Sequence, residues 1–546
     1  MKLLVKLLLS LVVLLLVLVS LGYALLRSHW GITTASRWIS DATPYHLSIE
    51  QLSHDWSHPL TFHIDQVTFG EDGQPALLIA GKLSLSLTAR QLVNPTHFAQ
   101  ITIKQGTLVL SNLTPEATLP ISADRLELKA VQLLNPYPTN CLSAKHLNGV
   151  LAPWVPSQQA VLGKQFTFNF SAEGVHVAHR NFDKLTAQGS KDFQRLNITA
   201  LSGAVERGTF EGKLSRSAQG KWQIPTLQLD NIRFQTDKEL ADLFSTALLP
   251  PVTIQDLIIN HLSIVGPNWV ANDVSANGQN LTNVSGFSGH LALNAASVVL
   301  GTEQWSQPHL SVTAAENNII FDQFDAGWAK GTVSAKGQWL RKTKELQLDN
   351  LSLDNIRYTL PSNWRQVLQS RLPQAIQAIT LNNLRVENGL FIDINPGFPF
   401  QMTATHITGT QLQVAQQHQW GLWKGEAEYY AAAATFNRQD IRALWLKLNA
   451  DHDRLSVQDI KGLIQEGPMI GNLAISQSPT HPFELSLRGE KIPYAAFADW
   501  FWPRPLSGQG NFSLHLKGNI PSLSAPLSVT QGEFTTPTFS QQVGPK

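Results

Sequence analysis

The residues of this sequence that could do chemistry do not form a reactive group by their spacing. His54, His58 and His63 are the densest group of histidines, and a metal site is one interpretation because imidazole is a common metal ligand. These histidines lie in the segment HDWSHPLTFH, which has the pattern of a turn followed by a strand. We therefore favour partly exposed strand histidines. Pairs of Asp and Glu occur throughout the chain, and none stands out by its spacing as an acid and base pair.

Known reactive signatures are also missing from the sequence. It has no G-x-S-x-G elbow, no phosphate loop of the G-x-x-x-x-G-K-[ST] type and no H-E-x-x-H helix. We predict a protein that is not an enzyme and that uses no cofactor or metal. A net charge of +1, with 15% charged residues, predicts no nucleic-acid partner. Cys141 is the single cysteine, so no intrachain disulfide can form. Trp500 and Trp502 could touch lipid headgroups, but we favour packing of a short helix on a sheet.

The N-terminal segment carries a long apolar run. Twenty residues without a charge lie between Lys6 and Arg27, and a helix of about 20 apolar residues spans the roughly 30 Å core of a bilayer. Lys2 and Lys6 precede the run, so the positive-inside tendency predicts a cytoplasmic N-terminus and an exported remainder. A cleaved signal peptide is the alternative, since Ser20 and Gly22 offer a small-x-small site, but the apolar run continues past them. The expected anchor residues are Leu7, Leu11, Leu14, Leu18, Leu21 and Leu25.

From Tyr45 onward, apolar and polar residues alternate with period two, which is typical of strands with one apolar face. If one strand and its turn take about 12–25 residues, the exported part holds roughly 20–40 strands. Each apolar stripe is either the inner face of an ordinary sandwich or the wall of an apolar groove, and the sequence leaves both open. The candidate groove-lining residues are Leu83, Leu85, Ile101, Ile103, Leu108, Phe166, Phe168, Phe170, Phe512, Leu514 and Leu516.

An internal repeat organises the second part of the chain. LDNIRF at residues 229–234 recurs as LDNIRY at residues 353–358, and each copy is followed by a helical pattern, a proline and a strand. A fainter third copy places Ile492 and Tyr494 where the second copy has Ile356 and Tyr358. We divide the chain into a membrane anchor at 1–29, a β module at 30–155 and a repeated β region at 156–546, with short helices near 236–249, 362–372 and 494–502.

Three stretches of the sequence match the pattern of a known family. Residues 45–70 and 77–110 contain Trp56, Pro59 and Val67 and end in an I-x-I-x-x-G-x-L-x-L strand pair. Near the C-terminus, small residues punctuate the strands at Gly508, Gly510, Gly518, Pro521 and Gly532. In these features the chain resembles the AsmA-like family of inner-membrane-anchored periplasmic proteins in Gram-negative bacteria.

The resemblance implies a fold class and a function. The fold would be mainly β with an N-terminal transmembrane helix, an elongated, curved, repeat-built sheet that forms an open trough of the chorein or AsmA-like type, and a few short helices. The function would be phospholipid transport between inner and outer membranes and outer-membrane homeostasis, through an apolar β groove. Phospholipids, the inner membrane and outer-membrane or periplasmic proteins would be the partners. A scaffold that assists outer-membrane protein assembly is the alternative, and an envelope enzyme such as a glycan hydrolase is a third hypothesis.

Overall fold

The structure is a computed structural model. Within the described residues the chain is mainly β, with 31 strands and a few short helices. This confirms the mainly β fold class and lies in the expected range of roughly 20–40 strands, while the open trough stays a prediction. The described residues are 12–14, 17, 20–21, 24, 28–54, 57–109, 119, 121–135, 142–158, 160–177, 180–243, 251–284, 286–498, 500, 502, 504–522 and 527–544.

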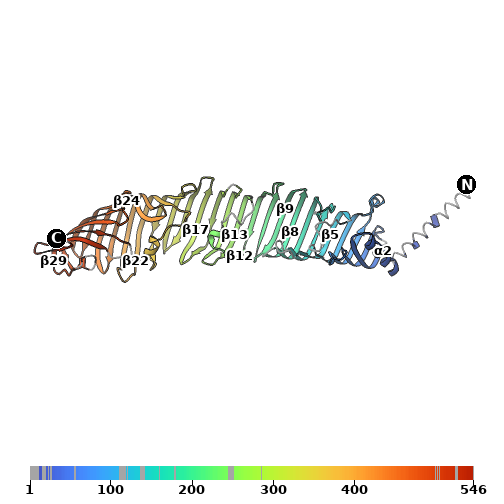
Figure 1. Ribbon diagram of the computed structural model, residues 1–546, viewed down its shortest axis with the longest axis horizontal. Coiled ribbons are helices and arrows are strands. Elements are labelled where there is room, and N and C mark those ends of the chain that lie inside the picture. Colours follow the sequence, from blue (N-terminus) through green and yellow to red (C-terminus); the bar gives the residue numbers. More distant parts are fainter. Residues whose placement is uncertain are drawn as a thin grey trace. The chain divides into compact units, whose positions relative to one another are not determined.

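The chain divides into two compact units, and the first comprises Met1–Gln235 and Ser245–Ser263. Its strands pair with their neighbours in chain order, and Figure 1 shows β5 to β9 lying side by side. Most pairs are antiparallel, while β4 with β5 and β11 with β13 are parallel. The elements are α2 (His29–Ala42), β1 (Tyr45–His54), β2 (Thr61–Glu71), β3 (Leu78–Ser86), a 3₁₀ helix (Ala89–Leu92), β4 (His97–Val109), β5 (Ser122–Asn135), β6 (Leu142–Ala152), β7 (Gln165–Val177), β8 (Arg180–Asp192), β9 (Arg195–Val205), β10 (Gly208–Arg216), β11 (Trp222–Asp230), β12 (Arg233–Gln235) and β13 (Val252–Val265).

The second unit comprises Thr236–Phe244 and Ile264–Lys546. Its strands again pair mostly antiparallel, while β20 with β22 and β21 with β22 are parallel. The elements are α3 (Leu240–Leu243), β14 (Trp269–Thr282), β15 (Ser288–Asn294), β16 (Ser297–Leu300), β17 (Glu303–Ala314), β18 (Asn318–Trp328), β19 (Gly331–Leu340), β20 (Glu345–Asp354), β21 (Arg357–Thr359), α4 (Trp364–Gln369), β22 (Ala378–Asp393), β23 (Phe400–Gln416), β24 (Gln419–Phe436), β25 (Gln439–Ala450), β26 (Arg454–Ile464), β27 (Gly467–Ser476), β28 (Pro482–Pro493), α5 (Ala495–Ala498), β29 (Gln509–Asn519), β30 (Ser528–Thr535) and β31 (Ser540–Val543).

Helix α2 leads into the first strand. Ser28 caps it by accepting a hydrogen bond from Gly31 N at 3.1 Å, and Leu47 N in β1 donates to Ser40 Oγ at 3.0 Å. Of the expected anchor residues, Leu14 and Leu21 are helical and exposed. No helix in the described part of the chain is long and apolar enough to cross a membrane. The anchor stays a prediction, because Leu7, Leu11, Leu18 and Leu25 lie outside the described residues.

Many strands contain a β-bulge, and the bulges break the strict alternation of the sequence. Gln105 in β4 and Ala130 in β5 have positive φ angles of 50° and 52°. Around Ala130 the register with β6 shifts between Leu128 and Val131, so three positions rather than two separate these residues. Because a bulge inserts one extra residue into one strand, the apolar side chains return to the same face after it.

The internal repeat corresponds to a shared backbone contact. In the first copy, a Cβ atom at Gly208 would lie 2.4 Å from the carbonyl oxygen of Asp230, and Asn231 next to it has a φ of 55°. In the other two copies the corresponding distance is 2.3 Å and φ is 56° and 54°. In all three copies the strand therefore bends at a residue with positive φ, and only glycine fits on the paired strand beside this bend. The equivalent residues are Gly331, Asp354 and Asn355 in the second copy and Gly467, Glu490 and Lys491 in the third.

The third copy differs after this bend. In the first copy β11 pairs with β13 in parallel, and in the second β20 pairs with β22 in parallel. In the third copy β28 pairs with β29 antiparallel, and α5 lies between them in the chain. The bend is thus common to all three copies, while the connection that follows it is not.

Thr405 in β23 carries a buried hydroxyl in the second unit, and its contribution to stability can be tested. It is 0% exposed, and its hydroxyl faces the buried hydroxyl of Tyr429. Burial raises the pKa of Tyr429 to about 12, and a hydrogen bond with the Thr405 hydroxyl opposes this rise. Because Thr405→Val leaves the buried Tyr429 hydroxyl without this bond, we expect it to lower the free energy of unfolding by about 1–3 kcal/mol, whereas Thr405→Val with Tyr429→Phe removes both hydroxyls and should be nearly neutral. Thermal unfolding measures this, with Thr410→Val at an exposed position of β23 as the control; a melting temperature for Thr405→Val at or above that of the double variant would contradict it.

Candidate functional site

One face of the sheet is apolar and the other is polar, and β7 shows the division most clearly. Phe166, Phe168 and Phe170 are buried or half-buried, whereas Thr167 and Asn169 between them are exposed. The three rings contact one another in sequence, with centroids 6.0 Å and 5.7 Å apart. The period-two pattern therefore places these phenylalanines side by side on the apolar face.

In the first unit, directly paired residues form an apolar row that runs across the strands. We call it row 1; it crosses β1 to β11 and β13, and each of its members is apolar or glycine. Three candidate groove residues, Leu83, Ile103 and Phe170, belong to it. Its members in order are Leu52, Ile64, Leu83, Ile103, Leu128, Gly149, Phe170, Ala187, Leu201, Gly212, Leu227 and Leu257.

A second row lies beside the first and crosses β2 to β10. We call it row 2, and it contains the candidates Leu85, Ile101 and Phe168. Leu108 lies outside both rows, paired with Leu78 and Leu133, and Phe166 pairs with Lys191. The members of row 2 in order are Phe62, Leu85, Ile101, Leu126, Leu151, Phe168, Gly189, Ile198 and Leu214.

The second unit has two rows of the same kind. Row 3 crosses β15, β17 to β20 and β22 to β30, and it contains the candidate Leu516. Row 4 crosses β18 to β20 and β22 to β30 and contains Leu514, while Phe512 pairs with Gly489. Row 3 comprises Leu293, Leu310, Phe324, Ala335, Leu351, Leu384, Gly409, Ala427, Leu448, Val457, Leu473, Leu485, Leu516 and Gly532; row 4 comprises Ala326, Val333, Leu353, Val386, Ile407, Tyr429, Leu446, Ile460, Gly471, Leu487, Leu514 and Phe534.

Glycines within the rows lie under the large side chains of neighbouring strands. A Cβ atom at Gly149 would lie 2.3 Å from Cδ1 of Phe170, and one at Gly471 would lie 2.3 Å from Cδ2 of Leu487. A side chain at either position would collide with its paired neighbour. These glycines therefore let Phe170 and Leu487 lie along the row rather than stand away from it.

The rows differ in exposure along their length. In row 1, Ile64, Ile103 and Leu128 are buried within one hydrophobic cluster. From β7 to β13, every member of rows 1 and 2 is half-buried, as are the members of row 3 from β15 to β22. Row 3 closes again toward β29, where Leu516 is 0% exposed. Each unit thus has a stretch of apolar rows that remains partly accessible to solvent.

The segment that follows β28 covers the C-terminal end of rows 3 and 4. Phe497 and Trp502 are buried against Phe512, Leu514 and Leu516 in one cluster. Trp502 Nε1 donates to Gln541 Oε1 at 3.0 Å, and Trp500 Nε1 donates to the carbonyl oxygen of Phe436 at 2.8 Å. The packing interpretation of the two tryptophans is confirmed. The assignment of the candidate residues to a lipid groove stays a prediction.

The histidines that suggested a metal site have separate partners. His54 Nε2 lies 3.1 Å from the carbonyl oxygen of Pro59, and His63 Nδ1 lies 2.8 Å from Ser84 Oγ. His58 Nδ1 lies 2.8 Å from Ser57 Oγ. Among the residues that the structure describes, no three His, Cys, Asp or Glu side chains are grouped so that they could hold a metal ion.

Sequence reasoning missed a polar cluster at Glu303 in the second unit. Trp328 Nε1 donates to Glu303 Oε2 at 2.8 Å, and the Tyr358 hydroxyl donates to Glu303 Oε1 at 3.0 Å. Burial, and next the hydrogen bond to Glu303, raise the pKa of Tyr358. The Trp328 ring also lies 5.6 Å from that of Trp305. These contacts join β17, β18 and β21, and no local signal reveals them because their members lie far apart in the sequence.

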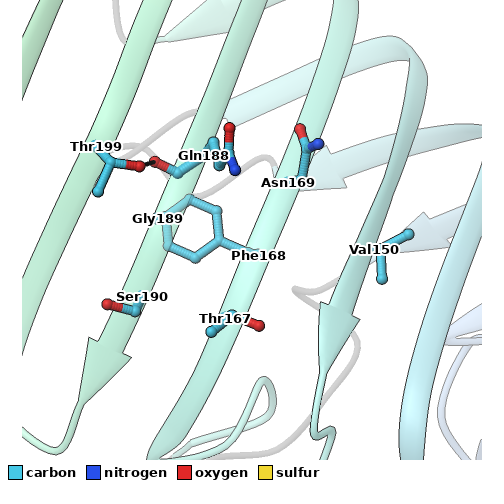
Figure 2. Close-up of a pocket in the computed structure, with 8 residues that line it drawn as sticks. All are labelled: Val150, Thr167, Phe168, Asn169, Gln188, Gly189, Ser190 and Thr199. Carbon is cyan, nitrogen blue, oxygen red and sulfur yellow. Dashed lines mark hydrogen bonds between the residues drawn. The ribbon is translucent and has the colours of Figure 1, made fainter.

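A shallow depression of about 360 Å³ lies on the first unit. Figure 2 shows the Phe168 ring directed toward Gly189, with polar side chains around it. Six of the eight lining residues lie outside the apolar rows, so the depression meets row 2 only at Phe168 and Gly189. Its lining residues are Val150, Thr167, Phe168, Asn169, Gln188, Gly189, Ser190 and Thr199.

Comparison with known proteins gives one relative over nearly the whole length. The chain is 34% identical over 540 residues to the AsmA family protein YicH of Escherichia coli (strain K12), covering 97% of this chain and 94% of that protein. No family model matches the chain. The WD40 domain of SCAP from fission yeast aligns at 11% identity over 90% of this chain and 93% of that chain, with a TM-score of 0.10 that carries no argument about the fold.

Proposed function

The chain belongs to the AsmA family, and on that premise we propose that it is a protein of the bacterial cell envelope whose apolar rows hold the acyl chains of phospholipids. Its N-terminal helix would anchor it in the inner membrane, with the rest of the chain in the periplasm. Phospholipids would move along the rows between inner and outer membranes. This role involves no catalytic step and no cofactor.

The continuity of the rows is the observation that supports this proposal most strongly. Row 1 and row 3 each pass from strand to strand without a polar residue, and the members on β7 to β13 and β15 to β22 are half-buried. Neighbouring strands lie about 4.8 Å apart, so an acyl chain lying across the strands would meet one apolar residue of a row on each strand. An ordinary closed core would instead bury these residues in the protein itself.

Acyl chains can bind to such a surface through the hydrophobic effect alone, without specific polar contacts. Each methylene group removed from water contributes about 0.8 kcal/mol. Because successive row members are similar in polarity, an acyl chain could shift along a row without losing its apolar environment. Movement would then be passive, and its direction would depend on partner proteins or on lipid consumption at one membrane.

Photo-crosslinking from neighbouring residues on opposite faces tests this function. Leu227 lies in row 1 and is half-buried, while Thr226 beside it is exposed on the polar face. With a benzophenone amino acid at either position of the full-length protein in cells, we expect radiolabelled phospholipid to attach at Leu227 and not at Thr226. Leu351 and Asn350 form a matched pair in the second unit. Equal labelling at both members of each pair, or no labelling at either, would contradict the proposal and favour a scaffold for outer-membrane protein assembly.

A further inference from the structure

Beside row 2, cationic residues interrupt an otherwise apolar line at one edge of the first unit. Phe166 in β7 pairs with Lys191 in β8, which pairs with Leu196 in β9; Leu196 pairs with Arg216 in β10, and Arg216 pairs with Trp222 in β11. We call this line the edge row. Its members on β7 to β10 lie two positions from members of row 2, so the edge row belongs to the same apolar face.

Both cations of the edge row lie over aromatic rings. Lys191 Nζ is 5.9 Å from the centre of the Phe166 ring, and Arg216 Cζ is 5.6 Å from the centre of the Trp222 ring. The aromatic faces hold the side chains over the sheet. The charged groups are thus placed along the border between the apolar rows and the ends of the strands.

Two adjoining depressions of about 620 Å³ each open at this border. Four cationic side chains line them, against one carboxylate, that of Asp192. Asp192 accepts a hydrogen bond from Gln165 Nε2 at 2.7 Å. None of the four cations has an ion-pair partner within the described part of the chain. The exposed ring of Phe193 adds an apolar surface to both depressions. The four cations are Lys164, Lys191, Arg195 and Arg216.

We infer that the edge row binds the phosphate of a phospholipid headgroup while the acyl chains of the same lipid lie in rows 1 and 2. This inference rests on the proposed function and assigns it a headgroup site. Lys191 and Arg216 are half-buried and exposed, respectively, so both can reach a phosphodiester at the rim. Charge-assisted hydrogen bonds from lysine and arginine to phosphate are among the stronger polar contacts of proteins. An apolar surface with an adjacent unpaired cationic border matches the two parts of a phospholipid.

A lipid comparison with a charge-neutralised variant tests this site. The full-length protein is reconstituted in vesicles that contain photoactivatable phosphatidylglycerol or photoactivatable diacylglycerol with the same acyl chains, so that only the phosphate-bearing headgroup differs. We expect about tenfold more labelling by phosphatidylglycerol than by diacylglycerol, which corresponds to about 1.4 kcal/mol. In the Lys191→Gln, Arg216→Gln variant this preference is expected to disappear, while labelling by diacylglycerol remains.

The same strands provide the matched control. Lys184 in β8 and Lys213 in β10 are exposed on the polar face, and Lys184→Gln with Lys213→Gln removes the same charge from these strands. This control should keep the preference for phosphatidylglycerol. If Lys191→Gln, Arg216→Gln keeps it too, or if the wild type labels equally with both lipids, the headgroup site is wrong and the acyl-chain proposal stands.

Two other results separate this inference from its alternatives. No labelling of the wild type by either lipid would contradict the proposed function itself. Calorimetric titration with inorganic phosphate distinguishes the source of the anion: if the double variant loses phosphate binding but keeps the lipid preference, the edge row is a site for free phosphate and the headgroup inference is overturned.

Discussion

Leu514→Glu is expected to unfold the C-terminal part of the second unit. Leu514 is 0% exposed and lies in a cluster with Phe497, Trp502 and Phe534. A carboxylate at this position has no solvent and no cation beside it in that cluster, and burial of an unpaired charge costs far more than a domain can absorb. The expected loss in the free energy of unfolding is more than about 4 kcal/mol.

Limited proteolysis and thermal unfolding measure this loss. The matched control is His515→Glu, because His515 is the next residue of β29 and is exposed on the opposite face. The control should melt close to the wild type, whereas Leu514→Glu should become sensitive to protease between β28 and β31. An unchanged melting temperature for Leu514→Glu would mean that the cover over rows 3 and 4 opens in solution.

The second large expected effect is a loss of phospholipid labelling when charges are placed in row 1, in its half-buried stretch between β7 and β13. Leu201 and Leu227 are half-buried and are separated along the row by Gly212 alone. Leu201→Glu with Leu227→Glu would place two carboxylates across the proposed path of the acyl chains. Because both positions reach solvent, the charges can remain hydrated and the loss of stability should be about 1–2 kcal/mol. Phospholipid attachment at a benzophenone placed at Leu257, the next member of row 1, should fall to background.

The control for this variant carries the same charges on the polar face. Ala200 and Thr226 are the exposed neighbours of the two leucines, and Ala200→Glu with Thr226→Glu should leave labelling at Leu257 unchanged. Equal labelling in the variant and the control would show that acyl chains do not follow row 1. Loss of labelling in both would point to general repulsion of lipid by added charge.

The sequence predicted the apolar face best where the alternation is unbroken. In β7, phenylalanine at every second position places Phe166, Phe168 and Phe170 on one face, as the structure has them. In β8 and β9 the register shifts between Gln188 and Gly189, so the period-two pattern is lost in the sequence although row 2 continues through Gly189. Because bulges and glycines interrupt the pattern, the sequence alone could not reveal that the rows are continuous.

The segment after β28, which packs over the C-terminal end of rows 3 and 4, could be predicted only in part. The sequence predicted a helix near 494–502, and α5 (Ala495–Ala498) lies in this range. Which face the helix covers depends on contacts across many residues, such as that between Trp502 and Gln541. Local patterns carry no information on such contacts, so an open stripe and a covered stripe of leucines look alike in the sequence.

The repeated LDNIR motif marks a position where the backbone adopts a positive φ angle. The Asn of LDNIR, Asn231 or Asn355, adopts positive φ beside a glycine that closely approaches the preceding carbonyl group. Asparagine tolerates this conformation better than most residues. In the third copy Lys491 takes that position at φ 54°. The sequence match is therefore weak in this copy, although the bend of the backbone is the same.

Native mass spectrometry of the full-length protein shows whether the apolar rows hold phospholipids. The wild type is compared with the Leu201→Glu, Leu227→Glu variant. Lipids bound at the N-terminal segment would be present on both proteins, so a difference in lipid number reports on row 1. We expect several phospholipids on each wild-type chain and fewer on the variant. The same number of lipids on both proteins, with both folded, would contradict the claim that the apolar rows hold acyl chains.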